Sequence, residues 1–178
     1  MIIQPFDPAD FDQFIVYLNK QLAENGKTEH CYFMPFERAD SKVGPEKLES
    51  FRRALAAPFP NPGWRQLWLA CDDDFNIVAH CDLRAHAERH TEHRCVLGIG
   101  VNQAYRNRGL GTRLIRHAET WACAQQIQWI DLEVLTVNAP AIRLYEVTGF
   151  HQVGEIEAKF ALDGAFYSET MMTKKLPL

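Results

Sequence analysis

The sequence predicts a mixed α/β fold: a mostly antiparallel sheet with a central parallel pair of strands and flanking helices. Apolar residues alternate along several short segments, as in strands, and recur at helical spacing in others. Between residues 93 and 149 these patterns follow each other as strand, helix, strand and helix. A crossover of that length makes the two strands of the unit parallel.

The composition is that of an ordinary globular protein. The 178 residues are 47% hydrophobic and 24% charged, with a net charge of −4. This length suffices for one core, the acidic balance disfavours general nucleic-acid binding, and no apolar stretch is long enough to span a membrane. Five scattered cysteines without a CxxC pair are typical of free thiols, so we expect a cytoplasmic protein.

The first third of the chain predicts a short strand at residues 2–6 and two helices, at residues 7–22 and from residue 45 onward. Residues 24–44 lie between the helices and show little periodicity. Loops of this length with aromatic residues are often lids or binding loops. The aromatic and apolar residues there are Tyr32, Phe33, Met34 and Phe36, and the acidic residues that could attract a cation are Glu29, Glu37 and Asp40.

The patterns in the rest of the chain predict the strands of the sheet and two further helices. Strands are expected at residues 66–72, 76–86, 93–101, 129–135, 151–157 and 166–174, with helices from Gly109 and from Asn138 to Gly149. Asn138 is a typical helix N-cap and Gly149 a typical stop. The residues expected to share one sheet face are Ile77, Ala79, Cys81 and Leu83 in one strand and Cys95, Leu97, Ile99 and Val101 in the next.

The turn into the helix at Gly109 predicts an anion site. The first N–H groups of a helix have no partner within it, and the helix dipole adds partial positive charge there. Arg106 and Arg108 supply forked donors, Gly109 and Gly111 remove side chains, and Thr112 adds a hydroxyl. The turn fits neither the GxxxxGK[ST] loop nor the GxGxxG fingerprint. A plain helix start with solvated arginines is the alternative.

Two motifs resemble those of the GNAT superfamily of acyl-CoA-dependent N-acetyltransferases. Arg106-Asn-Arg-Gly109-Leu-Gly111 is similar to the family's pyrophosphate loop, and residues 138–150, NAPAIRLYEVTGF, are similar to its second signature. The resemblance covers residues 77–154. It implies one N-acetyltransferase domain over residues 1–178, with a helical acceptor-side region (1–65), an acetyl-CoA-binding core (66–154) and C-terminal strands (155–178).

The resemblance also implies how acetyl-CoA is held as co-substrate. The strand before the loop would be kinked by a bulge at Gly98 and Gly100 and splay from its parallel neighbour; close packing of the glycines is the alternative. The pantetheine arm would pair with the main chain of Ile99 and Val101 and contact Asn138. The diphosphate would be bound by Arg106, Arg108, Gly109, Leu110, Gly111 and Thr112.

Catalysis would be direct transfer of the acetyl group to an amine. By the resemblance, Tyr145 would protonate the departing thiolate, while a half-buried packing role is its alternative. No residue stands out as the base that deprotonates the amine: Cys95 occupies the position where some members have glutamate, so His93, Asp82 and solvent are the candidates. We expect an amine acceptor, no nucleic acid or membrane partner, and no metal. A homodimer stays open.

Two other interpretations compete. His80, Cys81, His86, His90, His93 and Cys95 include zinc-ligand types, but neighbouring strand residues point to opposite faces, which argues against one shared site. The chain could instead be an acyl-CoA-binding sensor or interaction module without catalysis. Release of CoA in the presence of an amine would distinguish the enzyme from the sensor.

Overall fold

The computed structural model describes residues 1–27 and 32–177, and a seven-stranded sheet forms its centre. The strands are β1 (Ile2–Pro5), β2 (Arg65–Cys71), β3 (Ile77–Arg84), β4 (Arg94–Val101), β5 (Trp129–Leu135), β6 (His151–Leu162) and β7 (Ala165–Lys175). Their order in the sheet is β1-β2-β3-β4-β5-β7-β6. Within the described residues, β4 and β5 pair in parallel and the other neighbours are antiparallel, which confirms the predicted architecture.

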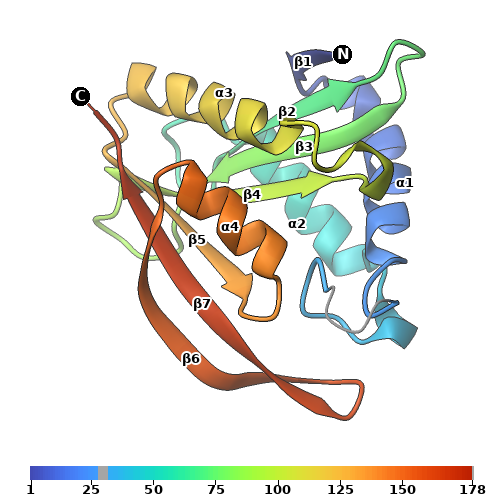
Figure 1. Ribbon diagram of the computed structural model, residues 1–178. Helices are drawn as coiled ribbons and strands as arrows, with labels where there is room; N and C mark the ends of the chain where they lie inside the picture. Colours follow the sequence, from blue (N-terminus) through green and yellow to red (C-terminus); the bar gives the residue numbers. More distant parts are fainter. Residues whose placement is uncertain (28–31, 178) are drawn as a thin grey trace.

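Helices cover both faces of the sheet. Figure 1 shows α3 (Leu110–Ala124) and α4 (Ala139–Val147) on one face, and α1 (Phe11–Leu22) and α2 (Pro45–Ala56) on the other. Short 3-10 turns are found at Pro8–Asp10, Arg38–Asp40 and Gln103–Tyr105. Among the described residues, every helix is too short or too polar to cross a bilayer.

The larger core lies between the sheet and α3 and α4. The apolar residues predicted for α3 are all buried there: Leu110, Leu114, Ile115, Ala118 and Ala122. On β4, Cys95 and Leu97 are buried in this core, and Ile99 and Val101 pack against it from half-exposed positions. The alternation predicted for β4 is therefore present, and Gly98 and Gly100 lie on the opposite face, toward α1 and α2.

The second core lies under α1 and α2, and it corrects one prediction. Ile77 packs here rather than with Ala79, Cys81 and Leu83, which belong to the larger core. The register explains the difference: Ala70 pairs with Ala79, whereas Cys71 pairs with Ile77, so one residue of β3 is bulged out. A one-residue bulge reverses the face on which the next side chain lies.

The C-terminal hairpin is longer than predicted. The strands β6 and β7 have 12 and 11 residues and meet at a turn around Gly164, so the expected boundary at residue 154 falls inside β6. Figure 1 shows this hairpin extending beyond the rest of the sheet. Most of β6 is exposed, so its sequence lacks the apolar–polar alternation from which the ends of a strand are predicted.

Candidate active site

The parallel strands β4 and β5 separate halfway along their length. They pair at Arg94 with Trp129, Cys95 with Ile130 and Val96 with Asp131. No further pairs form between them in the described residues, although β4 continues to Val101 and β5 to Leu135. The expected splay of these strands is therefore present, and it opens a gap in the middle of the sheet.

The main chain of Ile99 and Val101 faces this gap. Asn102 donates its N–H to the Val78 carbonyl across the β3–β4 ladder. In an antiparallel pair hydrogen-bonded positions alternate, so Gly98 and Gly100 also bond to β3 while Ile99 and Val101 turn their N–H and C=O groups toward β5. The Val101 carbonyl accepts a hydrogen bond from Arg106 Nε at 3.0 Å.

The two glycines of β4 have a packing role. A Cβ on Gly98 would lie 2.5 Å from Asp82 Oδ2, and a Cβ on Gly100 would lie 2.6 Å from His80 Cε1. The β3–β4 register runs without a shift from Val96 to Val101, so the bulge expected at these glycines is absent. Their missing side chains instead make room for the buried polar side chains of β3.

A cleft of about 980 Å³ is centred on the gap. One half is lined by the turn into α3 and by α4, and the other by α1, α2, the segment after residue 32 and the C-terminal hairpin. Of the predicted cofactor residues, the lining includes Ile99, Val101, Arg106, Gly109, Leu110, Gly111, Thr112 and Asn138, together with Tyr145. Asn107, which was not predicted, also lines it.

The turn at Gly109 has the geometry of an anion site. Gly109 is the residue before α3, with φ +74°, and a Cβ there would meet no atom within 4 Å. This left-handed conformation directs the first N–H groups of α3 outward and favours glycine. Gly111 has a different role, because its Cβ would lie 2.8 Å from Leu144 Cδ2, where α3 and α4 touch.

Arg108 does not line the cleft. Its guanidinium lies over the ring of Tyr105, 5.6 Å from the ring centre, and the side chain is exposed. Arg106, in contrast, reaches back to the end of β4. The turn thus presents one arginine to the inside of the cleft and one to its outer rim.

Asn138 has the predicted capping role and a second contact. Its side-chain oxygen accepts the N–H of Ala141 at 3.3 Å, which caps α4. Its amide nitrogen donates to the Tyr32 carbonyl at 3.4 Å. Asn138 therefore connects α4 to the segment that follows residue 32 on the opposite side of the cleft.

Tyr145 lies two turns farther along α4 and is 7% exposed. Its ring packs edge-on against Phe150, with 5.9 Å between the ring centres. Within residues 1–27 and 32–177 no hydrogen-bond partner of its hydroxyl is found. Burial raises the pKa of Tyr145, so the phenol keeps its proton and can donate a hydrogen bond into the cleft.

His93 is not near the cleft, and its predicted place on the strand face is wrong. β4 begins at Arg94, and His93 lies exposed in the preceding turn, where its carbonyl accepts the N–H groups of Gln128 and Trp129. Six residues of strand separate it from Ile99, which is about 20 Å. An alternating pattern continued by one residue too many caused this error.

A buried polar strip on β3 was largely missed. His80 is 4% exposed, and its Nδ1 lies 3.1 Å from Tyr17 Oη, which also donates to the Gly100 carbonyl at 3.0 Å. Burial lowers the pKa of His80 to about 4, so the ring is neutral near pH 7. Polar residues at every second position of a buried strand were the signal for this strip.

Asp82, one of the candidate bases, lies in the same strip. It is 4% exposed; its Oδ1 is 3.0 Å from Arg65 Nε and 3.7 Å from Arg84 Nη1. The contact with Arg65 is close enough for an ion pair, although its angle is unsuitable for a hydrogen bond. Oδ2 points toward Gly98, beside the main chain of Ile99.

Two acidic residues of the loop, Glu37 and Asp40, do not line the cleft. Glu37 and Asp40 are exposed beside the turn Arg38–Asp40, and Glu29 lies outside the described residues. For the zinc interpretation, His80 faces the cleft while Cys81 belongs to the opposite core. Over the described ranges, no cluster of three or more His, Cys, Asp or Glu side chains has metal-binding geometry.

Comparisons with known proteins identify a family. Residues 28–150 match the model of the Acetyltransferase (GNAT) family. The L-amino acid N-acetyltransferase AaaT of Escherichia coli K12 is 31% identical over 110 residues, which are 60% of this chain and 64% of that protein, just under two thirds of its length.

Solved structures extend the likeness to the whole chain. An acetyltransferase of the GNAT family from Streptococcus pneumoniae superposes with a TM-score of 0.80 at 25% identity, covering 99% of both chains. A phosphinothricin acetyltransferase from Sinorhizobium meliloti, solved in complex with AcCoA, has a TM-score of 0.77 at 13% identity, covering 98% of this chain and 88% of that one. With its split parallel strands, its glycine turn and the family match over residues 28–150, the chain belongs to the acetyltransferase (GNAT) family.

Proposed function

We propose that the protein is an N-acetyltransferase that transfers the acetyl group of acetyl-CoA directly to a primary amine of a small molecule or protein. The observation that carries the proposal is the gap between β4 and β5. There the main chain of Ile99 and Val101 has no β5 partner among the described residues, and the Gly109 turn follows shortly after β4. An extended arm with amide groups fits the first feature, and a diphosphate fits the second.

Acetyl-CoA would bind to both features, the Gly109 turn and the main chain of β4 that faces the gap. The N–H groups of Gly109, Leu110 and Gly111 begin a helix and have no partner within it, so they suit phosphate oxygens. Thr112 and the guanidinium groups of Arg106 and Arg108 would add donors and charge. Ile99 and Val101 would hold the pantetheine amides, with Asn138 on the facing side of the cleft.

Transfer needs charge stabilisation and one proton donor. A main-chain N–H of the splayed part of β4 would stabilise the negative charge that develops on the thioester oxygen. Tyr145 would donate to the sulfur as the C–N bond forms and the C–S bond breaks. Because burial raises the pKa of Tyr145, complete proton transfer costs more than for an ordinary tyrosine, and hydrogen-bond donation carries more of its role.

The ammonium form of the acceptor must lose a proton before it attacks. Asp82 would accept this proton; in support, its Oδ2 points toward Gly98, next to the main chain that would hold the thioester. His80 also lines the cleft, but burial lowers its pKa to about 4, which makes it a poorer base than an ordinary histidine. The overall reaction yields the amide, CoA as a thiol and one proton, which leaves through the open cleft.

The test combines binding with turnover. Calorimetry with CoA and acetyl-CoA should give saturable heat, and a thiol-reactive dye should detect CoA release when primary amines are added. Binding without release for any amine, peptide N-terminus or aminoglycoside would support the alternative, an acyl-CoA sensor of the same fold. Absence of heat at millimolar ligand would reject both functions.

A further inference from the structure

The acceptor side of the cleft carries an excess of positive charge. Lys47 from α2, Arg65 from β2 and Arg84 from β3 all line it, and Asp82 is the acidic residue paired with them. Among the residues that the structure describes, the other acidic ones lining the cleft are Glu24 and Glu169, which are paired with Lys27 and Lys159, and Glu133 across the gap on β5. The cluster of Lys47, Arg65, Asp82 and Arg84 therefore has a net charge of +2.

The sheet holds these charges close together. Arg65 and Arg84 are direct partners in the β2–β3 register, so two like charges face each other on one side of the sheet. That arrangement is unfavourable unless an anion lies between or above them. One carboxylate, Asp82, does so in part, at 3.0 Å from Arg65 and 3.7 Å from Arg84.

The remaining donors of the cluster face the cleft. In the described parts of the chain, Asp82 is the ionic partner of Arg65, whose guanidinium also lies over the ring of Phe51, 4.0 Å from its centre. Lys47 has a contact with the ring of Phe36 at 4.6 Å. Burial, then the charges of Arg65 and Arg84, lower the pKa of Lys47, which is the effect expected of uncompensated cations.

From this cluster we infer that the acceptor is a small zwitterion, an amine with a carboxylate a few bonds away, as in an α-amino acid. Its carboxylate binds Arg84, Lys47 and the free side of Arg65, and its amino group lies between Asp82 Oδ2 and the main chain of Ile99. Two residues of strand, about 7 Å, separate the α-carbons of Asp82 and Arg84, which suits a short molecule. This assignment rests on the proposed function and deepens it.

The same charges disfavour other amines. A polyamine or an aminoglycoside would bring further positive charge against Lys47, Arg65 and Arg84. An internal peptide bond in place of the carboxylate would leave the net charge of +2 on the cluster uncompensated, because it carries no charge. The cleft also includes the apolar side chains of Phe33, Met34 and Phe51, which can accommodate the side chain of an amino acid.

Matched acceptors test the inference. L-leucine, L-serine and L-phenylalanine are compared with their carboxamides, which keep the amine and lose the negative charge. We expect kcat/KM for the best acid to exceed that for its carboxamide by about 10- to 100-fold, the usual effect of a charged hydrogen bond. Arg84→Gln should remove most of this preference by lowering kcat/KM for the acid, with little change for the carboxamide or in the KM of acetyl-CoA. Arg89→Gln, in the exposed turn after β3, is the control that keeps the preference.

A binding measurement separates this inference from catalysis. Calorimetry in the presence of CoA compares N-acetyl-L-phenylalanine and N-acetyl-L-leucine with their carboxamides, and the acids should bind at least about tenfold more tightly in an Arg84-dependent manner. Carboxamides acetylated as well as the acids would overturn the inference while the proposed function stands. Arg84-dependent binding of the acids without any acetylation would support the subsite and reject the enzyme. Equal binding of acids and carboxamides would overturn the subsite.

Discussion

At the scale of single residues, Tyr145 illustrates how burial changes a catalytic group. Its hydroxyl is in the cleft wall and its ring is in the core beside Phe150, so removing the oxygen alone leaves the packing intact. Tyr145→Phe should lower kcat by about 10²–10⁴ if the phenol supplies the proton donor. The dissociation constant of CoA should stay within about twofold. Steady-state kinetics and calorimetry measure both values, and unchanged turnover would contradict the role.

His80 gives a prediction for stability against pH. Its pKa is about 4 in the folded protein and about 6.5 in an unfolded chain. Between these values the unfolded chain binds more protons, so the free energy of unfolding falls as pH decreases from about 6.5 to 4. His80 accounts for about 3 kcal/mol of this decrease in the free energy of unfolding. Below pH 4 this residue contributes no further loss.

Urea denaturation of wild type and His80→Gln at pH 7, 5 and 4 measures that share. The variant should lose less stability between pH 7 and pH 4 than the wild type does. His151→Gln, at an exposed position of β6, is the matched control and should follow the wild type. Parallel pH curves for wild type and His80→Gln would show that His80 does not titrate in this way.

At the scale of elements, the effect of the Gly109 turn on CoA binding should be separable from the stability cost of a left-handed backbone conformation. Gly109 and Gly63 have φ values of +74° and +79°, and a Cβ at either would meet no atom within 4 Å. Alanine at each position should therefore cost a similar amount of stability, about 1–2 kcal/mol. Gly109→Ala should also weaken CoA binding by at least about tenfold, because it redirects the first N–H groups of α3.

Gly63→Ala is the control for that experiment, since it lies in the connection before β2, away from the cleft lining. Calorimetry with CoA and thermal unfolding of both variants provide the two measurements. Equal affinities for CoA would mean that the turn does not shape the binding site. The comparison therefore tests the turn independently of its effect on folding.

At the scale of the whole molecule, distant segments are joined over the cleft. Tyr32 Oη donates to Asp163 in the turn of the β6–β7 hairpin, and the Arg38 guanidinium pairs with the same carboxylate at 3.1 Å. Between these two residues, Phe33 and Met34 line the cleft. The segment 32–40 is thus fastened to the C-terminal hairpin across the acceptor side.

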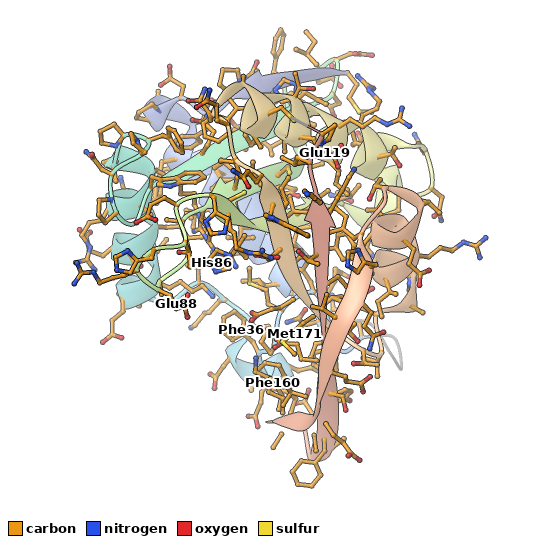
Figure 2. The ribbon with its side chains drawn as sticks, turned by 90° about the vertical axis from the view of Figure 1, so that its left-hand side faces the viewer. Phe36, His86, Glu88, Glu119, Phe160 and Met171 are labelled. Carbon is orange, nitrogen blue, oxygen red and sulfur yellow. The ribbon has the colours of Figure 1, made fainter. Side chains whose placement is uncertain are left out.

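Loosening this connection should affect the acceptor more than CoA. Tyr32→Phe should speed amide hydrogen exchange in residues 32–40 and raise the KM of the acceptor several-fold, with the dissociation constant of CoA unchanged. Arg52→Gln removes a different surface ion pair, with Asp12, and should leave both quantities alone. An acceptor KM unaltered by Tyr32→Phe would show that the connection does not shape the acceptor site. Figure 2 shows Phe160 on the lower side of the molecule, toward the end of the hairpin.

The sequence predicted correctly those elements that depend only on residues near one another in the chain. The apolar stripe of α3, the Asn138 cap and the parallel β4–β5 pair are each determined by residues within one segment or one crossover, so they were predicted and are present. The lengths of β6 and β7 were underestimated because an exposed hairpin needs no apolar alternation. For Gly98 and Gly100 the structure shows the alternative of close packing and not the expected bulge, because their environment depends on side chains of another strand.

The sequence alone determined the order of elements and the glycine turn before α3, because both follow from local periodicity and from backbone conformations that few residues adopt. The tertiary structure decided which polar residues meet in the cleft. His93 lies outside the cleft because it precedes β4, whereas His80 and Asp82 lie on the face of β3 that lines it. Lys47, Arg65 and Arg84 converge from three consecutive elements, α2, β2 and β3. Charge clusters of this kind arise from packing across the sheet, which local patterns cannot encode.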